Sequence, residues 1–268
     1  MTGVNVPKPM GDSTPEDVGL SFETLRIPLG DGVTRGAWYC RNRSGSDLAV
    51  LFHGYSEEKS SLIPEAGILH RLGCSVALID FRGSGESSES STTIGFSEAE
   101  DVVEACRYVE GLGNHDRLIL YGKSMGAAAV LKAVQSGEIS PDVLVLESVF
   151  DELLHAVENR FRRMNVPSFP SAQLLVFWGG VQSGYNGFSH CPVDYAKAVT
   201  CPVLFLHGEG DTSAAVTEGR RVFESAGSRL KEFTSFPGLG HVSIAKTRPE
   251  DWARGVEDFL RRAAAGDA

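Results

Sequence analysis

The feature that most constrains this chain is Gly122-Lys123-Ser124-Met125-Gly126, which stands between two runs of different character. The run Leu118-Ile119-Leu120-Tyr121 before it is apolar, as in a buried strand, and the alanine-rich run after it is typical of a helix. A G-x-S-x-G sequence at a strand-to-helix turn lifts one hydroxyl to the end of a sheet, and its glycines permit the sharp backbone path. The alternative is an ordinary Gly/Ser turn, because the motif alone also occurs by chance.

Length and composition are those of a soluble globular protein. The 268 residues are 42% hydrophobic and 22% charged, which suits one large α/β domain or one domain with an insertion. The net charge of −10 argues against a nucleic-acid-binding surface. No apolar run approaches the roughly 20 residues that span a bilayer, and the polar start MTGVNVPKPMGDSTPEDVG lacks the apolar region of a secretory signal. We therefore expect a cytoplasmic protein with no stable membrane association.

The cysteines are scattered and odd in number: Cys40, Cys74, Cys106, Cys191 and Cys201. Because no C-x-x-C spacing occurs, small buried thiols in a reducing compartment are the simplest interpretation. No cluster of His, Cys, Asp or Glu has the spacing of a metal site, so we expect neither a metal nor a cofactor.

Apolar runs that predict strands alternate with helical segments over most of the chain. The expected strands cover residues 22–28, 33–39, 47–53, 75–80, 118–121, 143–147, 202–208 and 230–236. Gly30-Asp31-Gly32 predicts a hairpin between the first two strands. Because the later strands are apolar throughout and separated by helices, they predict a mainly parallel sheet with helices on both faces. One of these helices follows Ser97-Glu98-Ala99-Glu100, which has the S-x-x-E spacing of a capping box.

The alternation of strands and helices breaks over residues 148–200. This segment is aromatic and contains prolines and a Gly-Gly pair, so it predicts short helices and turns. We interpret it as a lid inserted into an α/β core of residues 20–147 and 201–263. The alternative is a pair of surface helices that completes the wall of the fold. Residues 1–19 are polar and rich in Pro and Gly, and we expect them to form a loose arm.

A serine hydroxyl is a poor nucleophile at neutral pH unless a base takes its proton and a third group orients that base. Asp211 follows the strand at 202–206, and His241 lies on a glycine-rich turn beyond the last strand. Both residues come just after a strand, as Ser124 does. The sequence therefore predicts Ser124 as nucleophile, Asp211 as acid and His241 as base.

Other residues are weaker candidates for these roles. Glu147 also ends a strand and is the chief alternative acid for the same histidine. Asp80 ends a strand too, but the glycine-rich loop after it should hold its carboxylate in a structural role. His53 and His207 end strands and are expected to be structural hydrogen-bonding groups. Lys123 adjoins the nucleophile, but in such a turn its side chain should point away from the active face.

The oxyanion that forms during acyl transfer needs two fixed N–H donors. The backbone N–H of Met125 is one of them, because it lies at the start of a helix whose dipole favours negative charge. The second should come from the loop His53-Gly54-Tyr55, where the glycine lets the chain turn inward. We assign it to the backbone N–H of Tyr55, whose side chain is then free to line a substrate pocket.

These motifs resemble those of the α/β-hydrolase superfamily over about residues 20–263. The matching sequences are HGYS (53–56), DFRGSGES (80–87), GKSMGA (122–127), PVLFLHGEGD (202–211) and GLGH (238–241). The chain is most similar to the serine-aminopeptidase-like hydrolases, a group that contains many carboxylesterases. The resemblance implies a mostly parallel, eight-stranded sheet with a lid after the sixth strand. It also implies a nucleophile at Ser124, an acid at Asp211, a base at His241 and oxyanion donors at Tyr55 and Met125. The D-x-x-V-P sequence usual after the acid is absent here.

The sequence predicts a serine esterase that acts on a small or medium acyl or aryl ester through an acyl-enzyme, as a monomer or homodimer with a small-molecule substrate. The same triad would serve a peptidase or amidase, a thioesterase or a carbon–carbon bond hydrolase. An aminopeptidase needs carboxylates that bind a free amino terminus; Asp151, Glu152 and Glu158 are candidates, although they also fit the solvated face of a helix. A non-catalytic binding protein on the same fold is a further alternative, which the intact triad disfavours.

Overall fold

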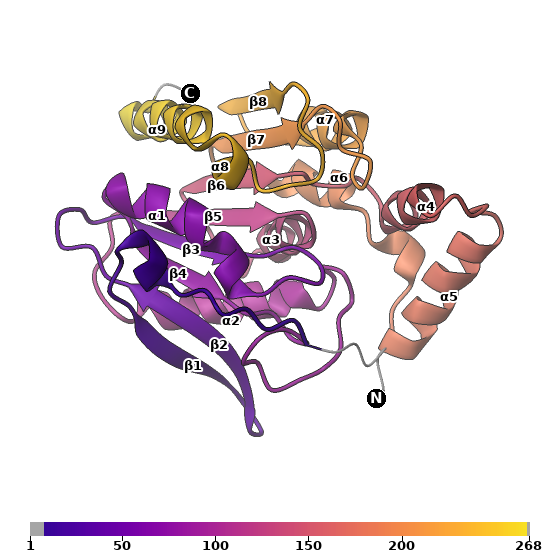
Figure 1. Ribbon diagram of the computed structural model, residues 1–268, viewed down its shortest axis with the longest axis horizontal. Helices are drawn as coiled ribbons and strands as arrows, with labels where there is room; N and C mark the ends of the chain where they lie inside the picture. The colour runs from indigo at the N-terminus through magenta and orange to yellow at the C-terminus, as the bar shows by residue number, and fades with distance from the viewer. Residues whose placement is uncertain (1–7, 267–268) are drawn as a thin grey trace.

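An eight-stranded sheet runs through the protein, whose computed structural model describes residues 8–266 (Figure 1). The strands lie in the order β1-β2-β4-β3-β5-β6-β7-β8. Their bounds are β1 Glu23–Gly30, β2 Val33–Cys40, β3 Leu48–Phe52, β4 Ser75–Ile79, β5 Leu118–Lys123, β6 Val143–Glu147, β7 Val203–Gly208 and β8 Lys231–Phe236. β2 pairs antiparallel with both β1 and β4, and the remaining pairs are parallel. The expected eight-stranded, mainly parallel sheet is confirmed.

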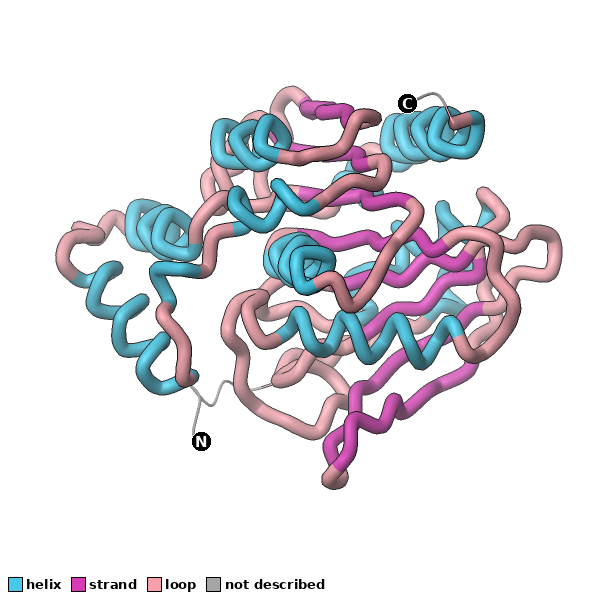
Figure 2. Tube along the Cα trace, turned by 180° about the vertical axis from the view of Figure 1, so that it is seen from behind, coloured by secondary structure: helices cyan, strands magenta, loops and turns pink. Residues whose placement is uncertain are grey.

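Helices cover both faces of this sheet, as the two opposite views show (Figure 1, Figure 2). α1, α8 and α9 pack on one face, and α2, α3 and α7 pack on the other. The helix bounds are α1 Ile63–Arg71, α2 Glu98–Glu110, α3 Met125–Ser136, α4 Leu153–Arg163, α5 Ser171–Ser183, α6 Pro192–Tyr195, α7 Val216–Ser225, α8 Ile244–Thr247 and α9 Pro249–Ala265. Short 3₁₀ turns are η1 Pro15–Val18, η2 Lys59–Leu62, η3 Gly187–Ser189 and η4 Ala196–Ala198.

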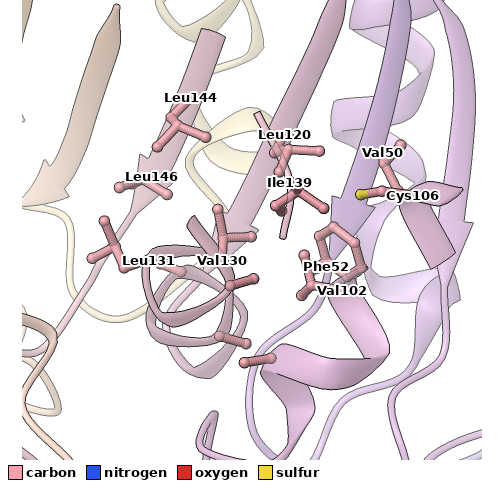
Figure 3. Close-up of a cluster of buried hydrophobic side chains, with 14 of the residues drawn as sticks. Val50, Phe52, Val102, Cys106, Leu120, Val130, Leu131, Ile139, Leu144 and Leu146 are labelled. Atoms are coloured by element: carbon pink, nitrogen blue, oxygen red, sulfur yellow. The ribbon is translucent and has the colours of Figure 1, made fainter. Parts of the chain in front are cut away.

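Alternate residues of the central strands enter two separate cores. Val50, Leu120 and Leu144 belong to the cluster formed with α2 and α3, part of which Figure 3 shows. Ile119 and Val145, on the same strands, belong to the cluster on the opposite face. Because both faces are covered, these strands are apolar at nearly every position. This is the pattern from which the sequence predicted buried strands.

The turn between β1 and β2 is a two-residue hairpin turn. Gly30 pairs with Val33, and Asp31 and Gly32 between them have φ values of 48° and 77°. A type I′ turn needs positive φ at both central positions, which favours Asp-Gly. The expected hairpin is confirmed.

The arm expected over residues 1–19 lies against the body over its described part. The Gly85 N–H donates to the Pro9 carbonyl oxygen at 3.2 Å, and the buried Pro15 begins η1, which lies against α1. These contacts bury an apolar side chain and pair backbone polar groups. The described part of the arm is therefore joined to the body at Pro9 and at Pro15, and residues 1–7 lie outside the described residues.

Between β6 and β7 the chain is helical. α4 and α5 form a helical pair that packs through Leu153, Val157, Ala172 and Val176 and stands away from the sheet in Figure 1. The pair exposes large apolar side chains of α5, namely Leu174, Leu175, Phe177, Trp178 and Val181. By contrast, α6 and η4 contact α3 and join the core. Within residues 8–266, no helix has both the length and the apolar composition needed to cross a bilayer.

Candidate active site

Ser124 occupies a strained turn between β5 and α3. β5 ends at Lys123 and α3 begins at Met125, so the chain changes direction at a single residue. Ser124 has a φ of 53° and a ψ of −112°, a conformation that residues with a side chain rarely adopt. Its N–H donates to the Glu147 carbonyl oxygen at 2.8 Å, which fixes the turn to the neighbouring strand. Strain of this kind is typical of functional sites.

The two glycines of the motif are required by close backbone approaches. A Cβ on Gly126 would lie 2.3 Å from the Phe52 carbonyl oxygen at the end of β3, and a Cβ on Gly122 would lie 2.7 Å from Ala127 Cα. Without these side chains, α3 starts directly against the end of β3. The close approach holds Ser124 at the carboxyl edge of the parallel strands.

We expect Gly126→Ala to lower the free energy of unfolding by about 2–4 kcal/mol, because the new methyl group collides with backbone rather than with a mobile side chain. Denaturant unfolding measures the loss. Gly255→Ala in α9 is the matched control: its added Cβ has no neighbour within 4 Å in the described chain. This control should be neutral or stabilising by about 0.5–1 kcal/mol. Equal stability of Gly126→Ala and the wild type would contradict the close contact.

Asp211 and His241 meet beyond the ends of β7 and β8. His241 Nδ1 lies 2.7 Å from Asp211 Oδ2, while Asp211 Oδ1 accepts hydrogen bonds from the N–H groups of Ser213 and Ala214. His207 Nε2 lies 2.8 Å from the Ala214 carbonyl oxygen and supports the same loop. Burial by itself would raise the pKa of Asp211, but these hydrogen bonds, above all that from His241, lower it below its ordinary value. Asp211 is thus an ionised carboxylate that orients His241.

Glu147, the alternative acid, is engaged elsewhere. Its Oε1 accepts the Ile244 N–H at 3.0 Å, and its Oε2 accepts the Trp252 indole N–H at 3.1 Å, so the buried carboxylate joins β6 to α8 and α9. Burial, reinforced by the charge of Glu65, raises the pKa of Glu147 to about 8. Both oxygens of Glu147 are therefore occupied by groups other than His241.

Two other residues that follow strands make structural contacts. Asp80 accepts hydrogen bonds from the backbone N–H of Lys59 at 2.9 Å and from its Nζ at 2.7 Å. His53 bridges two loops, because its Nδ1 lies 2.7 Å from the Gly54 carbonyl oxygen and its Nε2 accepts the Phe81 N–H at 3.1 Å. His53 therefore steadies the loop after β3.

The loop after β3 lies against Ser124. A Cβ on Gly54 would lie 3.6 Å from Ser124 Cβ, and Gly54 and Tyr55 line the same cleft as Ser124. Among residues 8–266, no acceptor pairs with the backbone N–H of Tyr55 or with that of Met125. Two N–H groups near Ser124 are therefore available to an oxyanion.

A cluster of charged side chains adjoins this loop, and no local sequence pattern indicates it. Lys123 Nζ binds Glu57 Oε1 at 2.7 Å, so the lysine beside the nucleophile is neutralised by a carboxylate. Glu65 is fully buried; its Oε1 accepts the Ser243 hydroxyl at 2.6 Å, and its Oε2 has no partner in the described chain. With Glu147 the cluster holds three carboxylates and one cation. The charge of Glu65 raises the pKa of Glu147, and the charge of Lys123 lowers it.

We expect Glu65→Gln to be more stable than the wild type at pH 9 by about 1–2 kcal/mol, and nearly equal to it at pH 5. A carboxyl group whose pKa is raised by folding destabilises the fold once the pH exceeds its unfolded pKa, because the folded protein must then bury a charge or keep a proton. Burial raises the pKa of both Glu65 and Glu147, so removing one charge relieves the other. Thermal unfolding from pH 5 to 9 measures this, with the exposed Glu110→Gln as control. A gain that does not grow with pH would contradict the buried cluster.

Ser124 and His241 open into a cleft of about 480 Å³. Its lining residues are Gly54, Tyr55, Ser56, Glu57, Ile94, Ser124, Phe150, Ala156, Val157, Arg160, Arg163, Met164, Ser213, Ala214 and His241. The sequence did not single out Arg160 and Arg163, because nothing local fixes which side of α4 meets the cleft. Within the part of the chain that the structure describes, no three His, Cys, Asp or Glu side chains are grouped to hold a metal ion.

Known proteins share this architecture. The family model described as serine aminopeptidase S33 matches residues 46–172. The uncharacterized protein Rv2307c of Mycobacterium tuberculosis is 32% identical over 217 residues, which cover 79% of this chain and 69% of that protein. The lysophosphatidylserine lipase ABHD12 of Rattus norvegicus is 23% identical over 248 residues, or 83% of this chain and 61% of the lipase. Among solved structures, the Pyrococcus furiosus esterase Pf2001 has a TM-score of 0.82 at 22% identity, over 97% of this chain and 98% of the esterase.

Proposed function

Because the chain belongs to the α/β-hydrolase superfamily, we propose that it is a serine hydrolase that cleaves carboxylic esters with Ser124, His241 and Asp211. The observation that carries this proposal is the hydrogen bond between His241 and Asp211 beside the cleft into which the strained Ser124 opens. The similar proteins include an esterase and a lipase, which favours an ester as substrate.

In the proposed reaction, His241 Nε2 takes the proton of Ser124 Oγ as this oxygen attacks the ester carbonyl carbon. The N–H groups of Tyr55 and Met125 stabilise the oxyanion. When the intermediate collapses, the alcohol leaves with the proton from His241 and an acyl-enzyme remains. Water, activated by the same base, then attacks the acyl-enzyme and releases the acid. Asp211 stays ionised throughout, in keeping with its lowered pKa.

The helical pair α4–α5 is proposed to cover the bound substrate as a lid. α4 supplies Ala156, Val157, Arg160 and Arg163 to the cleft that contains Ser124. The buried Asn159 joins this helix to the body, because its Nδ2 donates to the Ser213 carbonyl oxygen at 3.1 Å. α4 thereby forms a wall of the substrate site, and its side chains help to select the ester.

An ester fits this cleft better than a peptide with a free amino terminus. The candidate carboxylates for an ammonium group are paired elsewhere: Asp151 with Arg221 at 2.5 Å, and Glu158 with Arg162 at 3.1 Å. Neither they nor Glu152 belong to the described lining of the cleft. We therefore favour esterase over aminopeptidase activity.

Labelling with a fluorophosphonate probe, followed by peptide mapping, tests this proposal together with p-nitrophenyl esters of increasing acyl length. We expect covalent modification at Ser124 and turnover of short or medium esters. Labelling without turnover of any ester would shift the assignment to peptides or thioesters. A folded protein that is not labelled would contradict an activated Ser124 and favour a binding role.

A further inference from the structure

Two arginines of α4 line the same cleft as Ser124. The Arg160 guanidinium lies over the Tyr55 ring, with its central carbon 5.3 Å from the ring centre. Arg163 Nη1 donates to Ser213 Oγ at 2.5 Å. One cation is thus held against the loop after β3, and the other is held against the loop after β7.

Neither of these arginines forms an ion pair with an acidic side chain of residues 8–266. Arg162, which lies between them in the sequence, pairs with Glu158 at 3.1 Å and is not part of the cleft lining. The acidic residue of that lining, Glu57, is already paired with a buried lysine at 2.7 Å. In a protein of net charge −10, the cleft therefore keeps two positive charges that the described carboxylates do not neutralise.

The position of these arginines near the end of α4 does not explain why, within the described chain, Arg162 has a carboxylate partner and Arg160 and Arg163 have none. Cations in the last turn of a helix interact favourably with its dipole, and Arg160, Arg162 and Arg163 all lie there. The dipole therefore favours paired and cleft-lining arginines alike. Of the three arginines, the two that line the cleft have no carboxylate partner among residues 8–266. This is expected if an anionic group of the substrate binds them.

An apolar cavity of about 210 Å³ adjoins the cleft between α4 and α5. It shares Tyr55, Ile94 and Val157 with the cleft, and Leu175 and Val176 form part of its remaining wall. Its described lining contains no charged side chain. An acyl chain suits this apolar cavity, because burial of the chain's apolar surface is favourable and no charge is desolvated.

We infer that Arg160 and Arg163 bind an anionic group, a carboxylate or a phosphate, on the alcohol part of the substrate, while the acyl chain occupies the apolar cavity between α4 and α5. Guanidinium groups present paired N–H donors that match the oxygens of both anions. The inference rests on the proposed ester hydrolysis at Ser124. It names the substrate class as an apolar acyl group joined to an anionic alcohol.

Three esters with the same butyryl group test this inference: those of 4-hydroxybenzoate, 4-hydroxyphenyl phosphate and the neutral methyl 4-hydroxybenzoate. The quantity compared is kcat/KM for an anionic ester divided by kcat/KM for the neutral ester, in which general losses of catalysis cancel. We expect this ratio to fall about tenfold in Arg160→Gln and in Arg163→Gln, mainly through KM. It should also fall in the wild type as salt rises to about 1 M. The anionic ester with the larger fall identifies the preferred anion.

Arg162→Gln is the matched control, because it removes a cation from the same helical turn but outside the cleft lining. Its ratio should equal that of the wild type. Hydrolysis of the neutral ester with an unchanged ratio in both cleft variants would overturn the anion site and leave the proposed function intact. An equal fall in Arg162→Gln would also overturn it, in favour of a long-range charge effect. No hydrolysis of any of the esters, with no labelling of Ser124, would overturn both proposals.

Discussion

Ser124→Ala is expected to lower kcat/KM for a neutral butyryl ester by at least about 10⁴-fold, because it removes the attacking oxygen and leaves substrate binding and the oxyanion donors to act alone. The fold should persist, since alanine keeps the Cβ and the backbone N–H that donates to the Glu147 carbonyl oxygen. Steady-state kinetics measures the loss, and thermal unfolding shows that the variant is folded.

Ser148 offers a closely matched control for this substitution. It follows directly on β6, has a φ of 52°, and carries a buried hydroxyl without a partner among residues 8–266. Ser148→Ala should keep activity within about twofold and should be as stable as the wild type or slightly more so, because it removes an unsatisfied polar group. Similar losses in Ser124→Ala and Ser148→Ala would contradict the assignment of the nucleophile.

The elements predicted correctly from the sequence are those that depend on local pattern. The central strands are apolar because both faces are covered, and Asp31-Gly32 suits a turn with positive φ at both positions. The turn at Ser124 was found for the same reason, since its glycines and the change from strand to helix are adjacent in the sequence. Short-range geometry decides all of these features.

The predicted capping box at Ser97 is wrong, because contacts distant in sequence compete with it. Ser97 makes no side-chain hydrogen bond to the helix, and Glu100, its expected partner, binds Arg82 at 3.0 Å. The carboxylate that orders this region is Glu98, whose Oε2 accepts the Gly95 N–H at 2.8 Å. The S-x-x-E spacing describes a local exchange, and it carries no information about what the neighbouring loops offer to the same carboxylates.

The residues of the candidate site likewise divide into those that a local sequence pattern indicates and those whose role depends on distant contacts. Ser124, Asp211 and His241 follow strands in glycine-rich turns, so local patterns in the sequence indicate them. Glu65 and Arg160 instead lie on helices, in the first turn of α1 and in the last turn of α4. Their significance depends on which helix face meets the body. That orientation is set by packing against residues far along the chain, and a single sequence does not report it.

Asp211→Asn is expected to lower kcat by about 10³–10⁴-fold while Ser124 and the cleft stay in place. Asparagine retains an oxygen for the loop N–H groups, but it has no charge to stabilise the protonated His241 and favours the wrong tautomer of the imidazole. Because the pKa of Asp211 is lowered by folding, its contribution to stability is present above the unfolded pKa and is lost as the pH falls through the folded pKa. The variant should therefore lose stability at neutral pH, and this loss should shrink as the pH falls below the ordinary pKa of an aspartate.

Glu147→Gln is the comparison that decides whether Asp211 or Glu147 is the acid that supports His241. Glutamine still accepts one of the two N–H groups that Glu147 binds, so this variant should keep kcat within about tenfold even if its unfolding temperature falls. A loss as large as that in Asp211→Asn, in a folded protein, would assign the acid to Glu147. The physical reason to expect otherwise is charge. A buried carboxyl with a pKa of about 8 is largely protonated at neutral pH, whereas the lowered pKa of Asp211 keeps it ionised beside the imidazole that must become a cation.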